Sequence, residues 1–182
     1  MEPEYEARFL AVDVDAVRAR LSEIGGTCVI PRILMRRLVF TNTDIQARRG
    51  WLRLRDEGVR TSLTYKQTGA TAATIDSTLE AEIQVSDFDG TRALLEAMGF
   101  TAVRYQENYR EEWKHQGVTF DLDTWPELPT FLEIEGRSEA AVRQATDALE
   151  LDFEHASYGS VDEVYLAVLD RDILAEQTLT FA

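Results

Sequence analysis

The sequence has little cysteine, little histidine and few positive charges. A single cysteine among 182 residues, Cys28, excludes an intrachain disulfide. The 33 acidic residues outnumber the 19 lysines and arginines, so the formal net charge is -14. A field of that sign repels nucleic-acid phosphates. We therefore expect no nucleic-acid partner, and an anionic ligand would need a local cluster of cations.

Long apolar runs and familiar catalytic motifs are also missing. The longest apolar run, residues 164–169, is far shorter than the roughly 20 residues of a membrane-spanning helix. No cationic and apolar leader opens the sequence, so we expect a soluble cytoplasmic protein with no membrane partner. The sequence contains no Walker loop, no zinc-ligand spacing and no nucleophile elbow, and His115 and His155 are isolated. None of these active sites is therefore predicted.

The length and composition predict one domain over residues 1–182. A hydrophobic content of 45% is enough for a sizeable core. Apolar residues at helical spacing follow the capping residues Asp13, Asp87 and Ser138. A last helix is predicted over 161–174, a short strand over 178–181, a polar loop over 41–50 and a mobile loop over 69–77.

Several extended segments alternate charged and apolar residues. In residues 4–9, Glu4, Glu6 and Arg8 share one face of a strand. Neighbouring carboxylates raise each other's pKa, and divalent cations bind carboxylate oxygens. One such strand is more often a solvated sheet face, but recurrence favours a metal site. The Glu-x-Glu pattern recurs at Glu80-Ala81-Glu82 and Glu133-Ile134-Glu135.

Basic side chains follow the same alternation. Arg53 and Arg55 share one face of a strand, and Lys66 lies on the polar face of the next. A turn signal at Asp56-Glu57-Gly58 predicts that the two strands form a hairpin. Arginine forks match phosphate oxygens bidentately, and lysine adds a point charge.

Two arrangements explain these strands. The charged face can be a solvated sheet face with cross-strand ion pairs. Alternatively, it can be the interior of an α+β fold in which an eight-stranded antiparallel β-barrel, a tunnel, has helices packed outside. A polyphosphate with a divalent metal would then satisfy both signs of charge. The inward candidates are Glu4, Glu6, Glu80, Glu82, Asp123, Glu133 and Glu135, with Arg8, Arg37, Arg53, Arg55, Lys66, Arg110 and Lys114.

The sequence also contains a weak internal duplication. The helix after Asp13 matches the helix after Asp87 at a spacing of 74 residues, and the preceding strands match at 76. We therefore expect two halves, each built from a strand, a helix and returning strands.

These motifs resemble the CYTH superfamily of triphosphate tunnel metalloenzymes, which includes class IV adenylyl cyclases, thiamine triphosphatases and inorganic triphosphatases. The family's opening Glu-x-Glu-x-Lys stands here as Glu4-Tyr5-Glu6-Ala7-Arg8, with arginine in place of lysine. The later motifs follow in order as Leu52-Arg53-Leu54-Arg55, Tyr65-Lys66, Glu80-Ala81-Glu82, Arg110, Leu122-Asp123 and residues 131–136.

The resemblance implies a tunnel that binds a triphosphate-containing small molecule end on, with Mg²⁺ or Mn²⁺ as cofactor. It implies catalytic roles for Lys66 and Arg8. It assigns metal binding to Glu4, Glu6, Asp123, Glu133 and Glu135, with Glu80 and Glu82 as second-rank candidates. It assigns phosphate binding to Arg8, Arg37, Arg53, Arg55, Lys66 and Arg110.

Two departures bear on the reaction. Many members have lysine where Asn108 stands, and the cyclase-like run is replaced at residues 122–131 by a turn containing Pro126 and Pro129. We therefore expect hydrolysis of an inorganic, nucleoside or thiamine triphosphate. Class IV cyclisation of ATP to cyclic AMP and pyrophosphate is the alternative. A non-catalytic polyphosphate- or nucleotide-binding protein also stays open, as does a homodimer.

Overall fold

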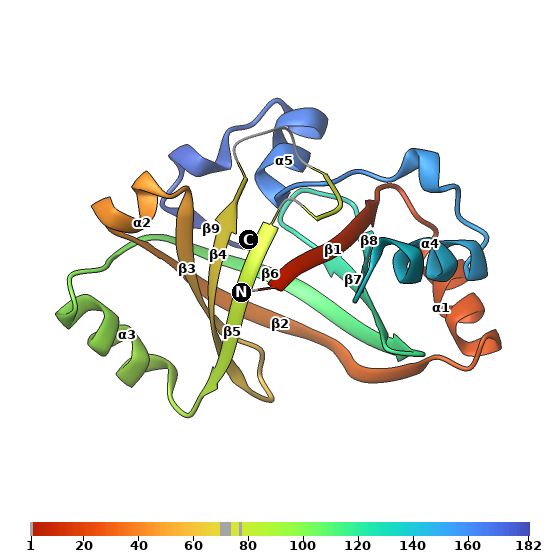
Figure 1. Ribbon diagram of the computed structural model, residues 1–182, viewed down its shortest axis with the longest axis horizontal. Helices are drawn as coiled ribbons and strands as arrows, with labels where there is room; N and C mark the ends of the chain where they lie inside the picture. Colours follow the sequence, from red (N-terminus) through yellow and green to blue (C-terminus); the bar gives the residue numbers. More distant parts are fainter. Residues whose placement is uncertain (1, 70–73, 77) are drawn as a thin grey trace.

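The computed structural model describes residues 2–69, 74–76 and 78–182 (Figure 1). Most of the loop predicted over 69–77 lies outside these residues. The elements are β1 (Glu2–Phe9), α1 (Val14–Glu23), β2 (Thr27–Thr41), α2 (Thr43–Ala47), β3 (Gly50–Asp56), β4 (Thr61–Thr68), β5 (Thr78–Val85), α3 (Phe88–Ala97), β6 (Thr101–His115), β7 (Val118–Thr124), β8 (Phe131–Gly136), α4 (Glu139–Ala148), η1 (Phe153–His155), α5 (Val161–Leu169), η2 (Ile173–Ala175) and β9 (Thr178–Leu179).

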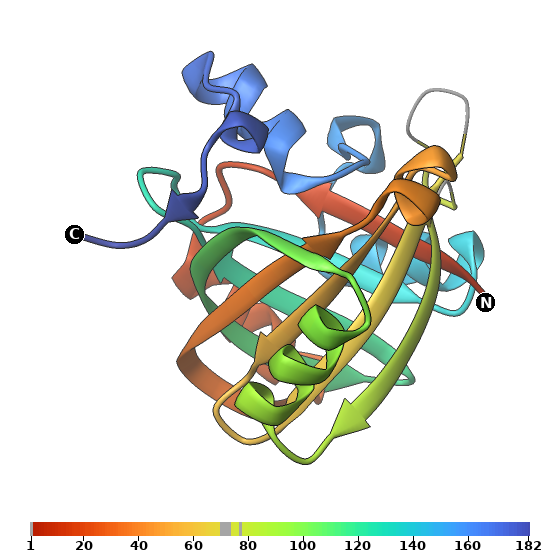
Figure 2. The ribbon, with the colours of Figure 1, turned by 90° about the vertical axis from the view of Figure 1, so that its left-hand side faces the viewer.

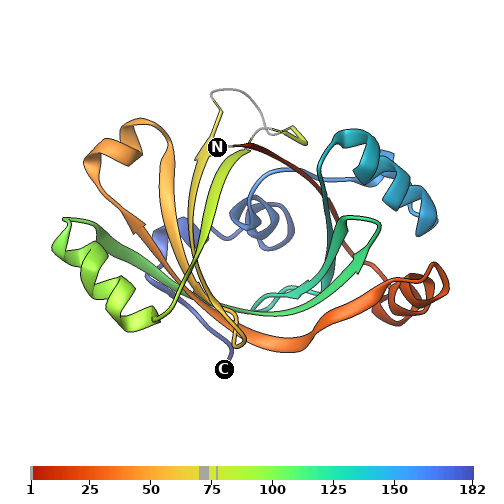
Figure 3. The same ribbon diagram turned by 60° about the horizontal axis from the view of Figure 1, so that its bottom comes forward.

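Eight of these strands curl into a ring (Figure 3). Their order is β2-β3-β4-β5-β1-β8-β7-β6, and the long antiparallel ladder between β2 and β6 closes the ring. The short β9 adds to β6 in the parallel sense. The predicted α+β fold with an eight-stranded antiparallel tunnel is thereby confirmed, and the solvated-sheet alternative is wrong.

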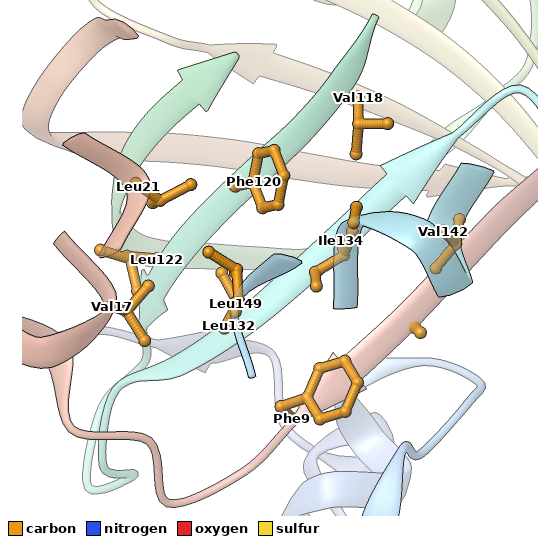
Figure 4. Close-up of a cluster of buried hydrophobic side chains, with 12 residues drawn as sticks. Phe9, Val17, Leu21, Val118, Phe120, Leu122, Leu132, Ile134, Val142 and Leu149 are labelled. Carbon is orange, nitrogen blue, oxygen red and sulfur yellow. The ribbon is translucent and has the colours of Figure 1, made fainter. Parts of the chain in front are cut away.

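The apolar core lies outside the ring rather than within it. On β8, Leu132 and Ile134 are fully buried toward the helices, while Glu133 and Glu135 alternate with them and point inward. Val17 of α1 packs against the same apolar layer. Figure 4 shows this cluster between the strands and α1 and α4; it comprises Ala7, Phe9, Val17, Leu21, Val118, Phe120, Leu122, Leu132, Ile134, Val142, Ala145 and Leu149.

Two further apolar clusters complete the outer shell. Leu95 of α3 packs with Leu38, Phe40 and Leu54 on the outside of β2 and β3, as Figure 2 shows for the helix. α5 lies across one end of the ring (Figures 2 and 3). Its cluster comprises Trp125, Leu128, Phe131, Val164, Tyr165, Ile173 and Leu179.

The predicted capping residues begin the helices. Asp13 accepts hydrogen bonds from the backbone of α1, Asp87 from Gly90, and Ser138 from Ala141. Each such cap stabilises its helix by about 1 kcal/mol, because it satisfies backbone N–H groups that lack an intrahelical partner.

Three local predictions are wrong. The region 41–50 is not all loop, because Asn42 caps the five-residue helix α2. The predicted helix over 161–174 ends at Leu169, since Asp170 adopts a left-handed backbone with φ 50°. The predicted strand over 178–181 shortens to β9. No helix in the described part of the chain is long and apolar enough to cross a membrane.

The predicted duplication agrees with the order of elements. The first half runs β1, α1, β2, β3, β4, and the second runs β5, α3, β6, β7, β8, apart from the short α2. The long strands β2 and β6 have 15 residues each and pair with each other. The two halves meet along this ladder, where β4 pairs with β5, and where β1 pairs with both β5 and β8.

Candidate functional site

The ring encloses a charged cavity of about 210 Å³. Every strand except β2 and β9 contributes a side chain to it, because the inward positions of each strand are polar. The lining residues are Glu4, Glu6, Arg53, Arg55, Arg60, Lys66, Glu80, Glu82, Arg110, Glu112, Lys114, Thr119, Asp121, Glu133 and Glu135.

The hairpin of β3 and β4 forms a basic wall. Arg53 lies opposite Thr64 and Arg55 opposite Ser62, so that both guanidinium groups face inward. Arg53 Nη2 donates to Thr64 Oγ1 at 3.3 Å. Lys66 extends the row, and its Nζ lies 2.8 Å from a carboxylate oxygen of Glu80 on the neighbouring β5.

Three buried donors, two on this wall and one behind it on β2, have no partner among the described residues. They are Nε of Arg37, Nε of Arg53 and Nη1 of Arg55. Burial and the neighbouring charges of Arg53 and Arg110 lower the pKa of Arg55, and burial with Arg53 and Arg55 lowers that of Arg37 well below its usual range. Unsatisfied buried donors are costly, so an acceptor that reached them, such as a bound anion, would be stabilised.

Arg110 and Arg8 form ion pairs within the acidic wall, which consists of the carboxylates that β1, β7 and β8 place in and behind the cavity lining. Arg110 on β6 donates to Asp123 at 2.7 and 2.6 Å and to Glu133 at 2.9 Å. Arg8 on β1 donates to Glu133 at 2.9 and 2.6 Å and to Glu6 at 2.8 Å. Although burial opposes it, the charges of Arg8 and Arg110 lower the pKa of Glu133 to about 2.

The acidic wall has an excess of negative charge, because its carboxylates are crowded together. Burial and the charge of Glu133 raise the pKa of Glu6 to about 8. Burial also raises the pKa of Asp121 well above its usual range, and burial and Glu4 raise that of Glu135. Asp121 Oδ1 has no hydrogen-bond partner within the described residues. Crowded carboxylates of this kind favour a bound cation or proton.

The donor set fits a hard divalent cation in chemistry, because it consists of carboxylate oxygens. Within the described ranges, however, no three His, Cys, Asp or Glu side chains are already grouped as metal ligands. Glu4 is held by Lys66, and Glu133 is held by Arg8 and Arg110. Metal binding at this wall would therefore exchange some of these ion pairs for metal–oxygen contacts.

The structure brings most of the sequence-predicted residues to the cavity. Three of them lie behind its surface instead: Arg8, Arg37 and Asp123 are buried in the wall. Arg37 donates to the Asn108 amide and stacks 4.5 Å from the centre of the Trp125 ring. The predicted residues that line the cavity are Glu4, Glu6, Arg53, Arg55, Lys66, Glu80, Glu82, Arg110, Lys114, Glu133 and Glu135.

Sequence reasoning missed other lining residues. Asp121 lies on the same face of β7 as Asp123, and Glu112 lies on the same face of β6 as Arg110, so strand periodicity could have included both. Arg60 lies in the turn between β3 and β4, where no period-two signal exists.

Solved structures share this fold. The PH1819 protein from Pyrococcus horikoshii is 26% identical with a TM-score of 0.65, covering 92% of this chain and 99% of that one. A candidate adenylate cyclase from Vibrio parahaemolyticus is 13% identical with a TM-score of 0.73, covering 90% and 97%. The candidate adenylyl cyclase HpAC1 from Hippeastrum, described as having a dominant triphosphatase activity, is 14% identical with a TM-score of 0.58, covering 91% and 94%.

Sequence comparison gives the family. No curated protein matches the chain. The CYTH domain matches residues 2–165, which span all eight strands of the ring. The chain therefore belongs to the CYTH domain family.

Proposed function

We propose that the protein is a divalent-metal-dependent triphosphatase that binds a triphosphate inside the ring and hydrolyses it. The observation that carries the proposal is that one wall has unpartnered cationic donors and the facing wall has crowded carboxylates. Nε of Arg53 and Nη1 of Arg55 are buried donors that lack an acceptor among the described residues, while Glu6 and Glu135 are crowded carboxylates. A triphosphate and a divalent cation together would neutralise both walls.

The basic wall would hold the phosphate chain. The open N–H groups of Arg53 and Arg55 can donate to phosphate oxygens, and Lys66 supplies a point charge beside them. Arg8 faces Glu6 and Glu133 rather than the cavity. We therefore assign Lys66 a direct role on the phosphates and Arg8 a role in holding the acidic wall.

The acidic wall would hold Mg²⁺ or Mn²⁺. Glu4, Glu6, Glu133 and Glu135 line the cavity, and Asp123 supports them through Arg110. When bound, such a cation polarises phosphoryl oxygens as a Lewis acid. Arg53, Arg55 and Lys66 would orient the phosphates beside this cation.

Hydrolysis fits the cavity better than cyclisation of ATP. Cyclisation needs adenosine held in a near-attack position, but no aromatic side chain is among the described residues that line the cavity. The α5 cluster lies across one end of the ring, which leaves the polar end near Arg60 and Lys114 for entry. The dominant triphosphatase activity described for HpAC1 also favours this reaction.

The test is product analysis with purified protein. Inorganic triphosphate, thiamine triphosphate and ATP are incubated in parallel with Mg²⁺ or Mn²⁺, and orthophosphate and cyclic AMP are quantified over many turnovers. We expect orthophosphate to dominate, and Glu96→Gln on the surface of α3 to behave as the wild type. Cyclic AMP as the main product would show a cyclase, and binding without turnover would show a binding protein.

A further inference from the structure

Glu57 lies behind Arg55 in the turn between β3 and β4. Its side chain is fully buried and does not line the cavity. Glu57 Oε1 accepts hydrogen bonds from Nε of Arg55 at 2.9 Å and from Ser62 Oγ at 2.9 Å, and it lies 2.7 Å from Nη2 of Arg55. Glu57 Oε2 accepts from Nε of Arg60 at 2.5 Å. One carboxylate therefore fixes two arginines that both reach the cavity.

These contacts leave one edge of the Arg55 guanidinium open. A guanidinium has five N–H donors in a rigid plane. Glu57 occupies the edge formed by Nε and Nη2, whereas Nη1 has no partner among the described residues. The open edge belongs to a side chain that lines the cavity. An oxyanion there would meet a donor edge whose direction is already set.

We propose that Glu57 is a positioning residue that orients Arg55 toward the phosphate chain of the substrate. The inference rests on the proposed function, because it assumes that a phosphate occupies the cavity. Glu57 touches no substrate in this scheme and acts through Arg55. Its charge also offsets the burial of Arg55, which would otherwise disfavour the charged guanidinium.

The direction in which Glu57→Gln changes triphosphate affinity separates positioning of Arg55 from a purely electrostatic effect of the Glu57 charge. Glu57 is an anion close to the proposed anion site, so its charge alone opposes phosphate binding. If only the field mattered, Glu57→Gln would bind triphosphate more tightly. If Glu57 orients Arg55, the same substitution weakens binding.

The first experiment measures inorganic triphosphate binding by calorimetry in chelator, where metal-dependent turnover is absent. We expect Glu57→Gln to bind about tenfold more weakly, the size of one lost charge-assisted hydrogen bond. In an Arg55→Ala background the same substitution is expected to cause no further loss. Glu96→Gln is the matched control. Unchanged or tighter binding by Glu57→Gln, or an equal loss in the Arg55→Ala background, would overturn the inference.

A second variant keeps the charge and moves the oxygens. Glu57→Asp withdraws the carboxylate from Arg55 by one methylene, so a field effect predicts wild-type affinity and positioning predicts a partial loss. This variant also serves if Glu57→Gln does not fold. Wild-type affinity in Glu57→Asp would count against positioning.

The last measurement does not need a substrate. In ¹⁵N-correlated NMR spectra of arginine side chains, the Nε–H signal of Arg55, assigned with Arg55→Lys, should be protected from exchange in the wild type and lose protection in Glu57→Gln. If the wild type failed to bind triphosphate, the proposed function would fall, while this signal would still report whether Glu57 holds Arg55. An unprotected signal in the wild type would overturn the positioning itself.

Discussion

Lys66 and Glu4 form an ion pair across the interior of the ring, with Lys66 Nζ 2.9 and 2.8 Å from the two carboxylate oxygens. They lie on β4 and β1, which are not neighbours in the sheet, because β5 runs between them. A predicted phosphate ligand and a predicted metal ligand thus neutralise each other. Binding of substrate and metal would have to separate this pair. The pair therefore couples the phosphate-binding residues to the metal-binding residues of the proposed site.

Glu4→Gln is expected to abolish turnover of inorganic triphosphate with Mg²⁺ while leaving the fold intact. The substitution removes a proposed metal oxygen, but Lys66 retains Glu80 as a partner. Phosphate release and the far-ultraviolet circular dichroism spectrum are the two measurements. Full activity of this variant, or full activity of the wild type in chelator, would contradict the metal dependence.

Inorganic triphosphate is expected to raise the melting temperature of the wild type. A ligand at one hundred times its dissociation constant stabilises the native state by about 2.7 kcal/mol, or roughly 5–10 °C for a chain of this size. Arg55→Ala should reduce this shift sharply, because it removes a donor of the basic wall. Arg92→Ala, on the exposed face of α3, should keep it. Equal shifts in both variants would place the binding site elsewhere.

Glu57 should contribute stability that disappears in acid. The charges of Arg55 and Arg60 and the Ser62 hydroxyl outweigh burial and lower its pKa from 4.5 to about 2. A group whose folded pKa is depressed stabilises the fold above its unfolded pKa, and this stability is lost as the pH falls through the folded value. The difference in unfolding free energy between wild type and Glu57→Gln should therefore shrink between pH 5 and about pH 2.

That difference should be on the order of 2 kcal/mol at neutral pH. Urea unfolding at several pH values provides the measurement, with Glu96→Gln as the surface control. A wild-type advantage that stays constant down to about pH 2 would show that the stability contributed by Glu57 does not depend on its charge.

Leu132→Ala should destabilise the fold by about 2 to 5 kcal/mol, because Leu132 is fully buried in the outer core and does not line the cavity. Leu94→Ala on α3 should cost little, since Leu94 is 60% exposed. Denaturant unfolding of both variants tests whether the core lies between the strands and the outer helices. Similar losses in the two variants would contradict that placement.

The local elements were determined by the sequence itself. Alternation in Glu4-Tyr5-Glu6 and in Glu133-Ile134-Glu135 predicts strands with one charged face, because side chains alternate at every residue. Asp13 and Asp87 predict helix N-termini, since their side chains accept hydrogen bonds from backbone N–H groups within three residues. The five-residue helix α2 was not predicted, because it is too short to show a helical repeat of apolar residues.

Tertiary structure decided which charged side chains meet. Whether a charged face meets water or an interior depends on the β2–β6 ladder, which joins residues from 60 (Thr41 and Thr101) to 87 (Thr27 and Lys114) positions apart and has no local signal. Asp121 lines the cavity and Asp123 is buried behind it, although both share one face of β7. Glu57 illustrates the same limit. Its sequence context indicates only a turn, and its burial against Arg55 exists because the hairpin folds back and the ring closes around it.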